Sequence, residues 1–184
     1  MDFRTRTHRR RILCSAHDGH SCAWTFKDVH GTFNFDPKDP ADSSVEVRID
    51  ARKIWTGEPT RDAHLRSADF LDVENFSEIT FHGNQTVVIG EVDYRVTGEL
   101  TIRGVTRPVP LEVHYLGQWK TPWWEDGVNK GPKTRAGFVA KTSINRHDFG
   151  VSWNDKMDKG GIVVSNTVEI TIDAEAILEA SEID

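Results

Sequence analysis

The chain has 184 residues and a net charge of −6, with 37% hydrophobic and 28% charged residues. This length favours a single domain, and the composition excludes an intrinsically disordered chain. The negative charge argues against a nucleic-acid surface as the main function, because such surfaces need a basic footprint. No stretch approaches the roughly 20 apolar residues with which a helix spans a bilayer.

The first 23 residues are basic and show no clean hydrophobic periodicity. Their longest apolar part, Ile12-Leu13, is far shorter than the ~7–15-residue core of a secretory signal. We therefore expect residues 1–23 to be an atypical, poorly ordered leader and the protein to be cytoplasmic. Cys14 and Cys22 lie in this leader, and their spacing indicates neither a disulfide framework nor a metal site.

Most of the chain after Trp24 predicts β-strands. Residues 44–54 alternate apolar with charged side chains, which indicates a strand with one face in water. Residues 93–102 and 109–115 alternate in the same way around a tight connection, Arg103-Gly104-Val105-Thr106, and this arrangement predicts a hairpin. The clearest strand pattern is the last one, at residues 168–176.

Two stretches interrupt the strand pattern. Residues 61–70 (RDAHLRSADF) concentrate Arg, Asp and His and predict one short helix, with the Thr60 hydroxyl as its N-cap. Asp62 then lies where the helix dipole favours a negative charge. Residues 118–132 combine turn formers with three tryptophans, Trp119, Trp123 and Trp124, and predict a loop.

About seven short strands with one short helix predict a sandwich or an up-and-down barrel. The outward faces are charged, which is the reverse of an outer-membrane barrel. Six small residues stand on otherwise bulky inward faces: Ala51, Gly98, Ala136, Ala140, Ala174 and Ala176. They indicate either unfilled space for a ligand or the taper of a packed barrel.

Six segments together resemble the YceI family of lipocalin-like proteins, in matching order from about Trp24 to Leu178. They read GTFNFDPKDP, SSVEVRIDARKIWTG, RDAHLRSADFLDVENF, ITFHG, VTGELTIRGVTRPVPLEV and INRHDFGVSWN. The resemblance implies an all-β fold, an extended antiparallel eight-stranded lipocalin-like barrel with one short helix, as one domain at residues 24–184. Residues 1–23 depart from the family. We interpret this departure as a reading-frame error or an alternative start in the gene model. If residues 1–23 are genuine, we expect a missing or altered first strand and an open seam in the barrel.

The resemblance further implies non-enzymatic binding, storage or transport of a long-chain isoprenoid or related lipid in the apolar lumen. No cofactor, metal or nucleic acid is expected; transient membrane contact and a homodimer stay open. The residues expected to line the lumen are Phe33, Phe81, Leu100, Phe138, Ile170 and Ile172. The residues expected at the mouth, near a head group, are Arg61, His64 and Arg146.

Several alternatives stay open. Asp62 and His64 can act as acid and base of an enzyme with an apolar substrate, although no nucleophile motif accompanies them. A filled barrel can instead act as a protein-interaction module. Arg61 or Arg146 can pair with Asp148 or Asp62 to fix a turn. A metal site built from the histidines at 64, 82, 114 and 147 lacks the usual ligand spacing. The tryptophan-rich loop either covers the barrel end or contacts lipid.

Overall fold

The computed structural model describes residues 4–7, 12–16, 22–26, 29–34, 43–155 and 164–179. The strands are β1 (Arg4–Thr7), β2 (Ile12–Ala16), β3 (Cys22–Phe26), β4 (Val29–Asn34), β5 (Ser44–Asp50), β6 (Ile54–Trp55), β7 (Glu78–Val88), β8 (Asp93–Ile102), β9 (Val105–Glu125), β10 (Val128–Asn145) and β11 (Thr167–Glu179). One α-helix, α1 (Pro59–Arg66), and two 3-10 helices, η2 (Ala51–Lys53) and η3 (Arg146–Phe149), complete the described elements.

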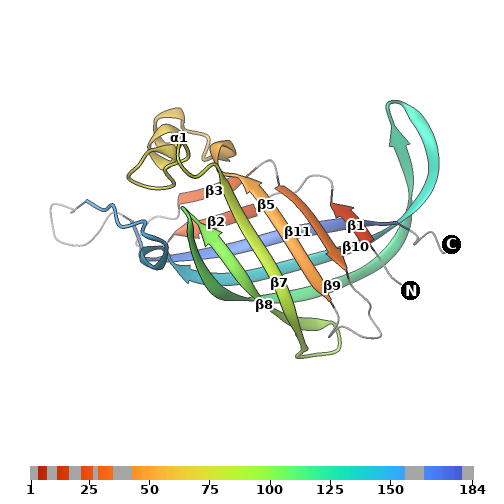
Figure 1. The fold of residues 1–184 in the computed structure, drawn as a ribbon. Helices are drawn as coiled ribbons and strands as arrows, with labels where there is room; N and C mark the ends of the chain where they lie inside the picture. Colours follow the sequence, from red (N-terminus) through yellow and green to blue (C-terminus); the bar gives the residue numbers. More distant parts are fainter. Residues whose placement is uncertain are drawn as a thin grey trace.

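Eight of these strands pair in a ring. Their order is β1-β4-β5-β7-β8-β9-β10-β11, all neighbours are antiparallel, and β1 also pairs with β11. The sheet therefore closes on itself, and the predicted antiparallel barrel with one short helix is confirmed. In Figure 1, α1 lies at one end of the barrel, and the tip of the β9–β10 hairpin projects beyond the other end.

The N-terminal segments complete this ring. β1 pairs with residues 177–179 of β11, and β2 pairs with residues 168–172, so both lie along the same edge of β11. β4 returns beside β1 and β3 returns beside β2. The predicted open seam is therefore wrong for the described residues, and the described parts of the predicted leader are strands. Side-chain periodicity missed these strands because they are short, interrupted and held by backbone pairing to β11.

The predicted β8–β9 hairpin is confirmed. Ile102 pairs with Val105, and the two residues between them, Arg103 and Gly104, have φ values of +52° and +72°. Two consecutive residues at positive φ are typical of a type I′ turn, whose twist matches that of the flanking strands. Gly104 supplies this conformation without steric cost.

The predicted loop at residues 118–132 is wrong, because this stretch continues the β9–β10 ladder. The pairing runs out to Glu125 and Val128, and the turn is confined to Asp126 and Gly127, both at positive φ. β8 pairs with β9 only as far as His114, and β11 pairs with β10 only from Arg135 onward. The outer part is thus a two-stranded ribbon, whose free edges tolerate its prolines.

The helix begins earlier than predicted. Glu58 is its N-cap, and its carboxylate oxygens accept hydrogen bonds from the backbone N–H of Thr60 at 3.0 Å and of Arg61 at 2.6 Å. These two bonds lower the pKa of the Glu58 carboxyl group. Thr60 is not the cap because Pro59, whose φ is preset for a first helical position, starts the helix one residue before it.

The small inward residues have different roles. Ala140 and Ala174 line empty space in the lumen, whereas Ala136 and Ala176 pair across β10 and β11 and are almost fully buried. Gly98 permits a close approach of strands. A Cβ atom there would lie 2.4 Å from the His82 carbonyl oxygen and 2.7 Å from the ring of Phe81.

Candidate ligand-binding lumen

The barrel interior contains two cavities of about 140 Å³ each. Three side chains, Val47, Leu111 and Ile172, line both cavities, and we call them the waist. Each cavity is similar in size to a cavity of roughly 150 Å³ that holds one benzene molecule. Neither cavity alone therefore accommodates a long chain, and a long ligand has to pass the waist.

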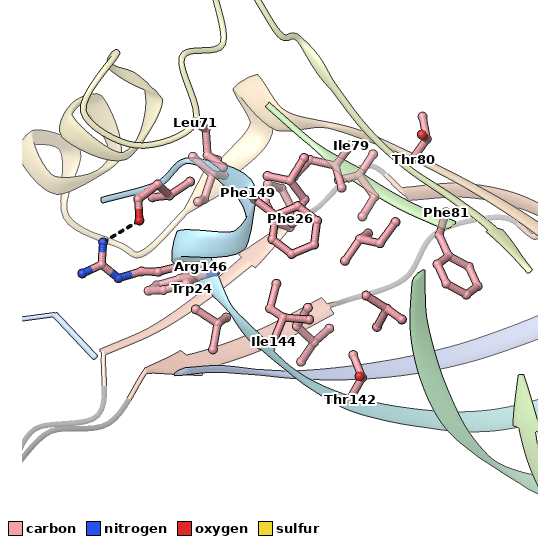
Figure 2. A pocket seen from close by; sticks show the side chains of 18 of the residues that line it. Trp24, Phe26, Leu71, Ile79, Thr80, Phe81, Thr142, Ile144, Arg146 and Phe149 are labelled. Atoms are coloured by element: carbon pink, nitrogen blue, oxygen red, sulfur yellow. Dashed lines mark hydrogen bonds between the residues drawn. The ribbon is translucent and has the colours of Figure 1, made fainter. Parts of the chain in front are cut away.

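The first cavity lies at the α1 end of the barrel. Strand residues such as Phe26, Ile79 and Phe81 form its walls, and Leu71 and Phe149 close it from the covering segments (Figure 2). Among the described residues that line it, three carry hydroxyl or charged side chains: Thr80, Thr142 and Arg146. An apolar cavity of this kind stays free of water and binds apolar groups.

The second cavity lies toward the projecting hairpin. Phe33 and Phe138 meet edge to face across it, with ring centroids 4.9 Å apart. Tyr115 packs on Phe138 at 5.3 Å, and burial raises the pKa of its phenol group. Several polar residues join the lining of this cavity: Thr32, Asn34, Ser43, Ser44, Thr86, Tyr94 and Asp173. Both cavities are nonetheless largely apolar, because most of these polar side chains alternate with inward-facing apolar ones.

The cover over the first cavity consists of α1, the turns that follow it, and η3. The rings of His64, Phe70 and Trp153 form a cluster in this cover, with centroids 4.6 to 5.3 Å apart. The Arg103 guanidinium of the β8–β9 turn donates hydrogen bonds to the carbonyl oxygens of Gly150 at 2.9 Å and Phe70 at 3.4 Å. One strand turn thus holds both parts of the cover.

Arg146 cross-links the cover from inside. Its side chain is buried, with 4% of its surface exposed. The guanidinium donates to the backbone carbonyl oxygens of Ser165 at 2.8 Å, Val151 at 2.9 Å, Trp153 at 2.8 Å and Val164 at 3.3 Å. Burial lowers the pKa of this group. A carboxylate was the predicted partner of Arg146, but among the described residues its guanidinium bonds to carbonyl oxygens. These carbonyls belong to residues 151–153 and 164–165, which meet η3 at this point.

The two residues of the acid–base alternative hydrogen-bond to different partners. Asp62 is buried, and its Oδ1 accepts from the Thr56 backbone N–H at 2.7 Å and from the Thr56 hydroxyl at 2.6 Å. The Nε2 of His64 lies 3.1 Å from Oδ2 of Asp69 on the partly exposed side of the cover. Asp62 thus ties the start of α1 to the preceding loop.

The predicted mouth residues lie at the α1 end, but only Arg146 belongs to a cavity lining. Arg61 is exposed on α1, and His64 is packed into the cover. All six residues predicted for the lumen belong to a cavity lining: Phe81, Leu100 and Ile170 to the first, Phe33 and Phe138 to the second, and Ile172 to both. Their contact with a ligand stays a prediction.

Sequence reasoning missed the waist as a functional feature, and it missed the polar lining of the second cavity. Val47 and Leu111 belong to alternating strand patterns, so their inward direction was predictable. Their position between the two cavities depends on strand register, and the sequence pattern could not predict it. Within the described residues, no group of three or more His, Cys, Asp or Glu side chains is placed to hold a metal ion.

No helix in the described part of the chain is long and apolar enough to cross a membrane. The strands instead form a closed antiparallel barrel whose lumen is largely apolar and whose one end is covered by a helix, which defines a lipocalin-like barrel protein. A family model for the YceI-like domain matches residues 11–176, and this chain belongs to that family. The match starts well before Trp24, so the sequence prediction placed the start of the resemblance too late.

Relatives in sequence and structure agree with this assignment. Protein YceI of Escherichia coli is 40% identical over 162 residues, which cover 88% of this chain and 77% of that protein. The crystal structure of the Campylobacter jejuni YCEI protein matches with a TM-score of 0.71 and 26% identity, over 89% of each chain. A polyisoprenoid binding domain from Saccharophagus degradans has the same fold, with a TM-score of 0.59 and 14% identity over 97% of this chain and 94% of that one.

Proposed function

We propose that this protein binds, stores or transports a long-chain isoprenoid or related lipid in its lumen and catalyses no reaction. The observation that carries the proposal is the pair of apolar cavities that meet at the waist. Each methylene buried there contributes about 0.8 kcal/mol before the costs of ordering the chain. A long apolar chain therefore gains affinity with few polar contacts. The polyisoprenoid binding domain of similar fold supports this choice of ligand.

Native mass spectrometry of protein purified from its own host tests this proposal. We expect a stoichiometric mass increment, and organic extraction should release a long isoprenoid or related lipid. Protein that carries no lipid and takes up none of a series of added isoprenoids would contradict the proposal. The cytoplasmic location stays a prediction, and fractionation of host cells tests it separately.

We also propose that the projecting hairpin, residues 116–134, makes transient contact with membranes. Trp119 and Trp124 are 40% and 61% exposed, and alternation along β9 puts them on opposite faces of the ribbon. The Trp123 ring lies 5.2 Å from the Lys133 ammonium and 5.3 Å from the Arg135 guanidinium carbon. Tryptophans with nearby cations are typical of the interface of anionic membranes. When a two-stranded ribbon inserts its tip into this interface, the side chains on both of its faces contact lipid.

The expected result is that protein binds vesicles of phosphatidylcholine with phosphatidylglycerol, and that Trp119→Ser with Trp124→Ser weakens this binding about tenfold or more. Vesicle co-sedimentation provides the measurement. Trp55→Ser is the matched control, because Trp55 is 43% exposed but lies on β6 beside α1, away from the hairpin. If the control and the double variant lose vesicle binding equally, the result would contradict membrane contact through the hairpin.

A further inference from the structure

Two hydroxyl groups in the second cavity have no hydrogen-bond partner in the part of the chain that the structure describes. Ser43, immediately before β5, is 8% exposed, and Thr86 lies on β7; both line this cavity. The Ser43 Oγ and the Thr86 Oγ1 are buried, and neither has a partner among the described residues. Leaving a buried hydroxyl unpaired is unfavourable, because the group has lost its hydrogen bonds to water without replacing them. A ligand oxygen that pairs with these hydroxyls would recover part of this cost.

The strand register brings the two hydroxyls to the same part of the barrel wall. Val45 pairs with Gly83, so Ser43 lies beside the part of β7 beyond Gly83, where Thr86 is found. A register shift between Gly83 and Gln85 marks a β-bulge at this point. Bulges reorient the side chains that follow them, and here the bulge precedes Thr86.

The first cavity offers no comparable group. None of its lining residues is among the described residues with an unpaired buried side-chain atom. Its one charged side chain, Arg146, directs its guanidinium to backbone carbonyls. The polar recognition available to a lumen ligand therefore lies at the end opposite α1, away from the predicted mouth residues.

The charges around the second cavity restrict the chemistry of the head group. Among the described residues, its lining contains no Lys or Arg side chain, and its acidic residue, Asp173, is exposed and alternates with the inward-facing Ile172 and Ala174. A phosphate or carboxylate would lose its hydration there without gaining a cation. A hydroxyl or carbonyl oxygen needs no cation and fits two hydroxyls, which both donate and accept.

We propose that Ser43 and Thr86 form a head-group site for an uncharged, oxygen-bearing lipid, whose apolar tail passes the waist into the first cavity. This inference rests on the proposed carrier function and adds the polarity and the orientation of the ligand. It places the head group at the hairpin end and leaves Arg146 to hold the cover.

Three probes with similar tails test the proposal: geranylgeraniol, the corresponding saturated hydrocarbon phytane, and geranylgeranyl diphosphate. We expect the unaltered protein to bind the alcohol about tenfold more tightly than the hydrocarbon, and to bind the diphosphate more weakly than the alcohol. In the double variant Ser43→Ala with Thr86→Val, the affinity for the alcohol should fall about tenfold. The affinity for the hydrocarbon should stay the same or rise. Isothermal titration or competition with a fluorescent lipid gives these affinities.

The variants are suited to this test because neither hydroxyl is bonded in the described structure, so their removal should leave thermal stability unchanged or higher. Thr142→Val removes a hydroxyl from the first cavity and is the matched control, for which the preference for the alcohol should persist. The head-group site would be overturned if the double variant lost affinity equally for the alcohol and the hydrocarbon. It would also be overturned if the unaltered protein bound the diphosphate most tightly. In both cases the carrier function would stand. If none of the three probes binds, the carrier function itself fails, and the head-group site fails with it.

Discussion

Val47→Trp is expected to abolish binding of a long isoprenoid while a short one still binds. Val47 is one of three waist residues, and the cavities on either side give an indole ring room without rebuilding the core. A blocked waist confines a chain to one cavity. Exclusion of about five methylene equivalents from the lumen costs about 4 kcal/mol, or roughly a thousandfold in affinity.

The measurement is a comparison of affinities for geraniol and geranylgeraniol in the unaltered protein and the variant. Glu46→Trp is the matched control, because it places the same ring on the exposed face of the same strand. We expect this control to bind both alcohols normally. If Val47→Trp folds with an unchanged circular dichroism spectrum and still binds the long alcohol at full affinity, the chain does not pass the waist.

Arg146→Met should lower the free energy of unfolding by about 4 kcal/mol. The substitution removes a buried guanidinium and leaves the carbonyl oxygens of Ser165, Val151, Trp153 and Val164 without their donor. These carbonyls belong to two separate chain segments, so the cover over the first cavity should loosen as well. We therefore expect lower affinity for lumen ligands in addition to lower stability.

Urea unfolding of the ligand-free protein measures the first effect, and lipid titration measures the second. Arg95→Met is the control, because Arg95 forms an exposed pair with Glu112 at 3.3 Å, and such pairs contribute little. If Arg146→Met does not fold, Arg146→Lys keeps the charge with fewer donors and should show an intermediate loss. Equal unfolding free energies for the Arg146 and Arg95 variants would show that the carbonyl contacts add no stability.

The two ends of the lumen are built differently. The α1 end is sealed by apolar side chains, by the Arg103 bonds to Gly150 and Phe70, and by Arg146. The opposite end holds the Ser43 and Thr86 hydroxyls and the projecting ribbon. If both proposals hold, the membrane-contacting hairpin and the head-group site lie toward the same end of the barrel, as expected for exchange of lipid with a membrane.

The sequence by itself determined most of the barrel. Period-two alternation at residues 44–54, 93–102 and 109–115 predicted strands and their inward faces, because one face of each strand meets the lumen and the other meets water. Alternation at residues 93–102 and 168–176 also placed Leu100, Ile170 and Ile172 on one face of their strands. The tight connection Arg103-Gly104-Val105-Thr106 between two alternating runs predicted the hairpin, and the structure confines its turn to Arg103 and Gly104.

Only the tertiary structure decided which residues close the barrel and which hydroxyls at the lumen lack a partner among the described residues. β1 and β2 lack a pattern of their own and are positioned by backbone hydrogen bonds to β11, more than 150 residues later in the chain. The partners of Arg146 are carbonyls from segments brought together by the fold, which no side-chain motif announces. Ser43 and Thr86 are ordinary polar residues in the sequence. Strand register and a β-bulge give them a shared cavity, because those features set the depth at which each side chain lies.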